Sequence, residues 1–263
     1  YSDLSKNLFS PRVRFTGILR AERFNKVLGF WIFLRGEHRP DLIPVVLVHG
    51  HVSGPRRLEK LANSLDPNRF EPWFCYFATG NDPEKSASLM RRSLSEMASR
   101  YHERRVVIVA YSFGGLIARR AITKNDDEVE LPEVPLFITV SVPWNGSQDR
   151  MFTRERNNPP ASWDDIVSGS SFLDGLFSTP LDQATAFHMV YGLGGRDRRS
   201  IPGEDDRILS EQSLSRVEAV VEAKSVRVFR HLDHLEIIEA PETIEHVTSL
   251  LDESFPGARN EDA

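Results

Sequence analysis

The sequence predicts an α/β fold with a mostly parallel central sheet and helices on both faces. Six short apolar segments have the composition of strands, and the most apolar of them lack the alternation that marks a sheet with one wet face. The segments between them carry apolar residues every three or four positions, which is the spacing of helices that bury one side. Strand and helix therefore alternate along the chain, a pattern that favours parallel strands joined by right-handed crossovers.

The elements follow one another in a regular order. Strands are predicted at residues 42–49, 70–77, 105–110, 135–142, 187–192 and 225–230. Helices are predicted at 54–65, 83–101, 113–124 and 210–223, and a last one at 241–254. Residues 144–185 have no clear period, and a loop-rich insertion of this length in a compact domain is usually functional. We therefore expect a lid or cap there.

Length and composition limit the classes of function. A chain of 263 residues with 40% hydrophobic residues suits a single α/β domain, taken here as 1–263. The net charge of −5 gives no sign of the concentrated basic surface that nucleic acids need, so we expect no nucleic-acid partner. The single cysteine, Cys75, cannot form an internal disulfide or a cysteine metal cluster, and we expect it in the core.

The first 42 residues form a basic segment with eight Lys or Arg against four Asp or Glu. Its apolar run at 27–34 is far shorter than the roughly 20 residues of a membrane-spanning helix. A solvated basic face with its apolar side packed on the domain is the preferred interpretation, and peripheral membrane contact is the alternative. Because the chain begins with Tyr1, the location stays open, and the cell envelope or secretion would follow if an upstream signal had been removed.

The segment AYSFGG joins a predicted strand directly to a predicted helix. At such a sharp turn the apex residue is strained, and the residues two before and two after it must be small, as Ala110 and Gly114 are. A purely structural turn does not need a serine at its apex. A phosphate-binding loop would need a lysine, which FGGLIARR lacks. The pattern therefore favours Ser112 as a nucleophile at the carboxyl ends of the strands.

This segment resembles the G-x-S-x-G nucleophile elbow of the α/β-hydrolase superfamily, in particular its bacterial lipase and esterase branch. Ala110 replaces the first glycine of that pattern. The resemblance implies the α/β-hydrolase fold and a catalytic triad in the chain order serine, acid, histidine. It extends over roughly residues 43–250.

For the acid, the resemblance points to the GEDDRILSEQSL segment and to Asp206. Arg207 stands where relatives usually have glycine, which leaves the turn geometry open. Asp205 and Glu204 are the alternatives.

For the base, the resemblance points to the loop after the last predicted strand, in HLDHLEII. His234 fits the family position best, and His231 is the alternative. A neutral imidazole can accept the serine proton near pH 7 when a carboxylate holds its other ring nitrogen.

The remaining site residues are also implied by the resemblance. VVLVHGHVSG is similar to the first-strand HG motif of lipases, which assigns the backbone N–H groups of His51 and Phe113 to an oxyanion hole. SVPWNGS resembles the stretch that borders the acyl pocket in this branch. Substrate contacts are accordingly predicted for Trp144, Phe172 and Phe177, and core packing is the alternative for each of them.

Taken together, these features predict a serine carboxylic-ester hydrolase that acts on small-molecule or lipid esters through an acyl-enzyme. An acyltransferase or amidase with the same triad is one alternative, and a non-catalytic binding protein on this fold is another. No cofactor and no catalytic metal are implied, while a structural calcium is left open. The sequence does not determine the acyl chain length or the oligomeric state.

Overall fold

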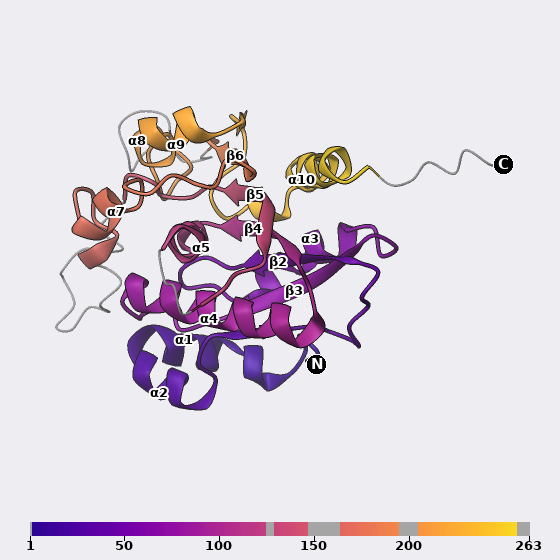
Figure 1. The fold of residues 1–263 in the computed structure, drawn as a ribbon. Coiled ribbons are helices and arrows are strands. Elements are labelled where there is room, and N and C mark those ends of the chain that lie inside the picture. Colours follow the sequence, from indigo (N-terminus) through magenta and orange to yellow (C-terminus); the bar gives the residue numbers. More distant parts are fainter. Residues whose placement is uncertain (1, 125–128, 147–163, 195–204, 257–263) are drawn as a thin grey trace.

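The computed structural model describes residues 2–124, 129–146, 164–194 and 205–256, and within them a seven-stranded sheet forms the centre of the molecule (Figure 1). The strand order is β1-β3-β2-β4-β5-β6-β7, and only β1 runs antiparallel to its neighbour. The predicted mostly parallel sheet is confirmed. The strands are β1 (Trp31–Phe33), β2 (Ile43–Val48), β3 (Phe70–Tyr76), β4 (Arg105–Tyr111), β5 (Glu133–Val140), β6 (Ala186–Gly192) and β7 (Ser225–Phe229).

Helices cover both faces of this sheet. The α-helices of the described ranges are α1 (Pro11–Leu19), α2 (Ala21–Val27), α3 (Glu59–Ser64), α4 (Pro83–Tyr101), α5 (Phe113–Thr123), α7 (Ser171–Gly175), α8 (Glu211–Leu214), α9 (Val217–Glu222) and α10 (Pro241–Ser254). Short 3-10 helices are η1 (Asn7–Phe9), η2 (Pro55–Leu58) and η4 (Ile237–Glu239). One face carries α4 and α5, and the other carries α3 and α10 (Figure 1). Each face has its own apolar core, and β4 lies between them with all residues after Arg105 buried.

The helix predicted at 210–223 is interrupted. The chain leaves the helical conformation at Ser215, and α9 begins after Arg216. The Arg216 guanidinium donates a 2.8 Å hydrogen bond to the carbonyl of Leu173, in the segment that carries α7. The break thus accompanies a side-chain contact between two distant segments, which local periodicity does not encode.

The basic N-terminal segment packs against the domain beside the carboxyl end of β3. The amide of Gly80 donates to the carbonyl of Gly17 at 3.0 Å, and the side-chain amides of Asn25 and Asn81 bond to each other at 2.8 and 3.3 Å. A Cβ atom at Gly80 would lie 1.9 Å from the carbonyl oxygen of Ile18, so this close approach requires glycine. The first two helices are therefore fixed near the edge of the sheet where the predicted site lies.

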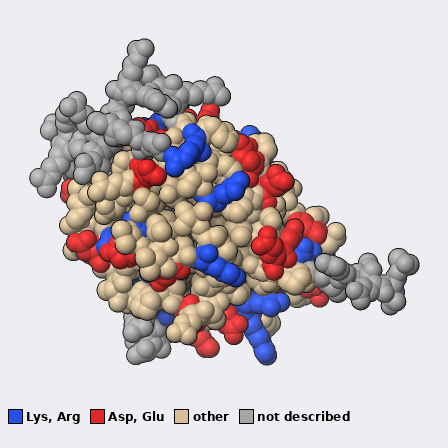
Figure 2. Space-filling model, turned by 90° about the horizontal axis from the view of Figure 1, so that it is seen from above, with Lys and Arg blue, Asp and Glu red and all other residues tan. Residues whose placement is uncertain are grey.

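Charged side chains of both signs lie on the surface of the protein (Figure 2). Lys and Arg are interspersed with Asp and Glu on the face seen from above (Figure 2). Within the described ranges, every helix is too short or too polar to cross a membrane.

Candidate active site

Ser112 stands at a strained turn between β4 and α5. Its backbone has φ 53° and ψ −132°, a conformation that L-residues rarely adopt and that costs of order 1–3 kcal/mol. The surrounding packing enforces it. A Cβ atom at Gly114 would lie 2.5 Å from the carbonyl oxygen of His49, and Ala110 is completely buried in β4. Both flanking positions thus hold small residues, as the sequence pattern predicts.

A continuous hydrogen-bonded chain joins three side chains. The Ser112 Oγ lies 2.9 Å from Nε2 of His234, and Nδ1 of the same imidazole lies 2.6 Å from Oδ2 of Asp206. All three residues are buried, and Asp206 has no exposed surface. The backbone strengthens the chain, because the His234 amide donates to the Asp206 carbonyl at 2.8 Å. This arrangement can remove a proton from the serine and stabilise the imidazolium that forms.

The second oxygen of Asp206 is occupied by the backbone of its own turn. Its Oδ1 accepts hydrogen bonds from the amides of Ile208 at 3.1 Å and Leu209 at 2.6 Å. The carboxylate is thereby held with Oδ2 directed at the imidazole. Of the alternatives, Asp205 instead accepts from the amide of Arg207 at 2.7 Å, and Glu204 lies outside the described residues.

Arg207 adopts the left-handed conformation expected for a glycine, with φ 75°. Its guanidinium binds a carboxylate oxygen of Asp233 at 2.8 Å. The other oxygen of Asp233 accepts from the amides of Leu235 and Glu236 at 2.9 and 2.7 Å. The replacement of glycine by arginine therefore keeps the turn and links it to the loop that carries the histidine.

The other predicted base, His231, lies elsewhere. Its imidazole is exposed and binds Glu242 at the start of α10, with 2.6 Å between Nε2 and the carboxylate. The structure therefore brings His234, and not His231, to the serine.

Tyr111 is a site residue whose role the sequence did not reveal. Its hydroxyl donates a 2.6 Å hydrogen bond to the carbonyl of His234, and the two rings lie 5.3 Å apart. Burial raises the pKa of the Tyr111 phenol above its usual range, so the group stays a neutral donor. No local pattern signals a bond between residues 123 positions apart.

The 49–54 loop follows β2 and lies against the serine. A Cβ atom at Gly50 would lie 2.8 Å from the Cβ of Ser112, so glycine is required for this approach. The His51 ring meets the ring of Phe113 edge-on with 5.4 Å between centroids. Burial lowers the pKa of His49 and of His51 to about 4, so both rings are neutral near pH 7.

Comparisons with known proteins bear on the family and on the fold. A family described as "Putative serine esterase (DUF676)" matches residues 43–153. No curated protein sequence matches the chain. Among solved structures, the mature Bacillus licheniformis lipase BlEst2 superposes with a TM-score of 0.68 at 21% identity, over 84% of this chain and 97% of that one. A monoacylglycerol lipase of Paleococcus ferrophilus gives a TM-score of 0.57 at 17% identity, over 85% and 97%.

A protein of Listeria innocua, the product of gene lin2722, gives a TM-score of 0.61 at 16% identity, over 83% and 97% of the two chains. The chain has the α/β-hydrolase fold. The predicted α/β-hydrolase fold is thereby confirmed. The family match supports a hydrolase of the esterase type, and the structural neighbours support the fold.

Two of the three predicted substrate residues, Trp144 and Phe172, lie in the interior of the protein, and the third, Phe177, is partly buried. Trp144 has no exposed surface, and its ring packs edge-on against Phe177 and Phe187 at 5.7 and 5.8 Å. Phe172 is 5% exposed. Their contact with an acyl chain stays a prediction. Three further apolar residues of the predicted insertion, Met151, Phe152 and Trp163, lie outside the described residues.

Phe177 is fixed by two arginines. The guanidinium carbons of Arg119 and Arg216 lie 4.0 and 5.0 Å from its ring centroid. Arg119 is completely buried, donates to the carbonyl of Leu176 at 3.0 Å and pairs with Glu222. This contact ties the segment around α7 to α5, the helix that follows the serine.

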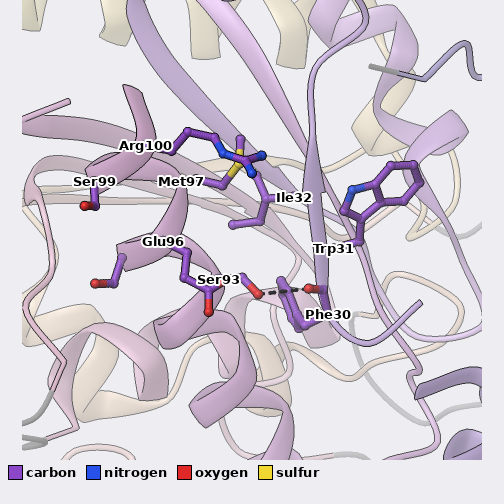
Figure 3. Close-up of a pocket in the computed structure, with 9 residues that line it drawn as sticks. Phe30, Trp31, Ile32, Ser93, Glu96, Met97, Ser99 and Arg100 are labelled. Atoms are coloured by element: carbon purple, nitrogen blue, oxygen red, sulfur yellow. Dashed lines mark hydrogen bonds between the residues drawn. The ribbon is translucent and has the colours of Figure 1, made fainter. Parts of the chain in front are cut away.

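A separate groove of about 670 Å³ lies between β1 and the second half of α4 (Figure 3). Phe30, Trp31 and Ile32 line one side, and the hydroxyl of Ser93 bonds to the Phe30 carbonyl at 2.8 Å. Its lining shares no residue with the hydrogen-bonded chain of Ser112, His234 and Asp206. Across the described ranges, no group of three or more His, Cys, Asp or Glu side chains has an arrangement that could hold a metal ion.

Proposed function

We propose that this protein is a serine carboxylic-ester hydrolase that acts on apolar acyl esters through an acyl-enzyme. The observation that carries the proposal is the buried chain from the Ser112 hydroxyl through His234 to Asp206. In this mechanism Ser112 is the nucleophile, His234 is the general base and acid, and Asp206 holds the imidazole and stabilises its charged form.

The first step forms the acyl-enzyme. The Ser112 oxygen attacks the ester carbonyl while Nε2 of His234 accepts the hydroxyl proton. The negative oxygen of the tetrahedral intermediate binds the backbone N–H groups of His51 and Phe113, and each such donor contributes roughly 3 kcal/mol. His234 then gives its proton to the leaving alkoxide. In the second step, water activated by His234 releases the carboxylic acid and restores the serine.

The two alternatives differ in what they predict for the products. An acyltransferase or amidase with the same triad would form the same acyl-enzyme, but an added alcohol or amine would accept the acyl group in preference to water, or an amide would be cleaved. A non-catalytic binding protein would form no acyl-enzyme. The 2.9 Å contact between Ser112 and His234 favours a catalytic role over the non-catalytic one.

The experiment is labelling by a fluorophosphonate probe combined with hydrolysis of 4-nitrophenyl butyrate. We expect the probe to modify Ser112, and Ser112→Ala to lose labelling and to lower kcat by roughly four orders of magnitude with an unchanged melting temperature. The control is Ser249→Ala, an exposed serine on α10 that bonds only to Glu253 among the described residues. Activity of Ser112→Ala within tenfold of the native value would remove Ser112 from the mechanism.

We further propose that the N-terminal helices contact a membrane surface. Phe15, Leu19 and Val27 are 50%, 54% and 76% exposed on α1 and α2. Two exposed arginines, Arg20 at the end of α1 and Arg23 in α2, lie near them, and basic residues beside apolar ones suit an anionic lipid surface. Sedimentation with vesicles that contain anionic lipid tests this, and Leu19→Ser should weaken binding. Equal binding of both proteins would contradict the proposal.

A further inference from the structure

A small pocket opens between the N-terminal segment and the 49–54 loop. Its volume is about 240 Å³, below the roughly 300–1,000 Å³ of pockets that hold a drug-sized ligand. It therefore suits a single chemical group of a larger molecule. Ser53 and Gly54 line it, and they lie two and three positions after the predicted oxyanion donor His51.

The charge of this pocket is strongly positive. Three arginines line it, Arg14, Arg56 and Arg57, against one carboxylate, that of Glu239. Glu239 is already paired with Arg57, with 2.6 Å between the guanidinium and the carboxylate. The pocket thus keeps two guanidinium groups that Glu239 does not neutralise.

Arg56 and Arg57 are held in place by backbone carbonyls. The Nε of Arg56 donates to the carbonyl of Leu4 at 2.6 Å, and its Nη2 donates to the carbonyl of Lys6 at 3.2 Å. Arg57 donates to the carbonyl of Leu235, the residue after His234. These contacts hold both arginines in position before any ligand binds. The carbonyls carry no net charge, so they do not neutralise the guanidinium groups.

Arg14 differs from the other two. Its Nε is buried and has no hydrogen-bond partner within the described part of the chain, and its guanidinium carbon lies 6.0 Å from the Phe15 ring centroid. A buried N–H group without a partner costs about 1–3 kcal/mol, so such groups normally bind something. Because Arg14 lines the pocket, an anion there would lie against this guanidinium and offer it acceptor oxygens.

The pocket lies on the same edge of the sheet as the serine. Arg14 lines the pocket together with Ser53 and Gly54 of the 49–54 loop. Tyr76 lines the pocket, and its ring centroid lies 5.9 Å from that of His49. Arg57 reaches the histidine loop through Leu235. The pocket and the Ser112 site thus share the 49–54 loop and the loop that carries His234.

We propose that this pocket binds a phosphate group carried by the ester substrate, so that the substrate class is a carboxylic ester with a phosphate on the same molecule. The inference rests on the proposed hydrolase function. Several arginines around one small volume suit a tetrahedral phosphate, which presents several acceptor oxygens and forms strong charge-assisted bonds with guanidinium groups. Free phosphate has the same chemistry, and the experiment separates the two sources.

The first arm compares two soluble substrates, dihexanoyl phosphatidic acid and dihexanoylglycerol, below their aggregation limits. We expect the native protein to favour the phosphate ester by about tenfold or more in kcat/KM, because a hydrogen bond to a charged group contributes enough for that factor. Arg14→Gln, which keeps most of the side-chain volume, should remove most of the preference. Arg14→Lys should restore part of it. Arg12→Gln removes the same charge from an exposed position on the same helix and should keep the full preference.

The second arm measures thermal unfolding with added inorganic phosphate. Phosphate should raise the melting temperature of the native protein and of Arg12→Gln, and it should raise that of Arg14→Gln much less. Suppose that phosphate raises the melting temperature only when Arg14 is present, but that both esters are hydrolysed equally. This result would overturn the proposal and assign the pocket to free phosphate. A preference that survives in Arg14→Gln would also overturn it.

The same data separate a failure of this inference from a failure of the proposed function. Equal and Ser112-dependent hydrolysis of both esters contradicts only the phosphate pocket. Absence of hydrolysis of either ester by the native protein contradicts the hydrolase function and, with it, the substrate assignment.

Discussion

Gly50 and Ser112 approach each other so closely that a Cβ atom on Gly50 would lie 2.8 Å from the serine Cβ and 3.1 Å from the ring of Tyr111. A Cβ atom does not approach another heavy atom this closely in folded proteins. One of the two segments must therefore move when residue 50 gains a side chain. Both segments are constrained. The serine is fixed by the strained turn, and Tyr111 is bonded to the histidine loop.

Gly50→Ala should therefore lower kcat/KM by roughly 100-fold, since a displacement of about 1 Å in a positioned site can have that effect. Hydrolysis of 4-nitrophenyl butyrate measures it. The control is Gly36→Ala, where an added Cβ meets no atom within 4 Å. A native rate in Gly50→Ala would show that the 49–54 loop does not need its position beside Ser112.

The two histidines of the last loop give a second prediction. His234→Ala should abolish ester hydrolysis, because it removes the only imidazole that the structure places within 2.9 Å of Ser112 among the described residues. His231→Ala should have a small effect, since that ring is exposed and binds Glu242. The measurement is the initial rate of ester hydrolysis by each variant at pH 7.5, and circular dichroism checks that both variants fold. The opposite ranking would reassign the base.

The sequence was sufficient for the parallel strands because their signal is local. Runs such as residues 105–110 are apolar on both faces, and the turn at Ser112 has its own pattern of small residues. The strand β1 (Trp31–Phe33) was missed, since it has three residues and pairs with Phe74–Tyr76 far along the chain. A short edge strand of this kind is defined by its partner and not by its own periodicity.

The candidate site also combines features that the sequence pattern shows with contacts that only a distant partner defines. The chain order of the superfamily was enough to select Ser112, Asp206 and His234, which the structure joins by hydrogen bonds. The contacts that orient them were not predictable, because they are single bonds between distant residues. Arg207 and Asp233 are 26 positions apart, and neither residue type marks a turn by itself. The sequence identified Arg207 only as a departure from glycine.

Arg207 gives a third prediction, which separates backbone strain from the ion pair. A left-handed residue other than glycine costs roughly 1–2 kcal/mol, whereas the contact of the Arg207 guanidinium with the buried Asp233 opposes that loss. Arg207→Ala keeps the strain and removes the ion pair, while Arg207→Gly removes both. We expect the glycine variant to be more stable than the alanine variant by about 1 kcal/mol in urea unfolding. Equal stability of the two variants, or a more stable alanine variant, would show that φ at this position is not a source of strain.

The last prediction concerns the dependence of the rate on acyl chain length. An apolar acyl site should raise kcat/KM roughly threefold or more per methylene from acetate to medium-chain esters, since each buried methylene contributes about 0.8 kcal/mol. Phe177 is the residue to test, because it is only partly buried, contacts Trp144 and is held by Arg119 and Arg216. Phe177→Leu should flatten the rise while the rate on acetate stays nearly native.

Loss of packing alone could also lower the rates, so the control must remove a similar ring elsewhere. Phe137→Leu serves this purpose, because Phe137 lies fully buried in β5 and stacks on Phe187 at 5.3 Å. Both variants should lose stability, by about 1–2 kcal/mol because leucine is smaller than phenylalanine, and both are assayed well below their melting temperatures. Only Phe177→Leu should change the slope of kcat/KM against chain length. If both variants keep the native slope, Phe177 supports the core and the acyl chain binds elsewhere; if the native slope is itself flat, the substrate is not selected by an apolar cleft.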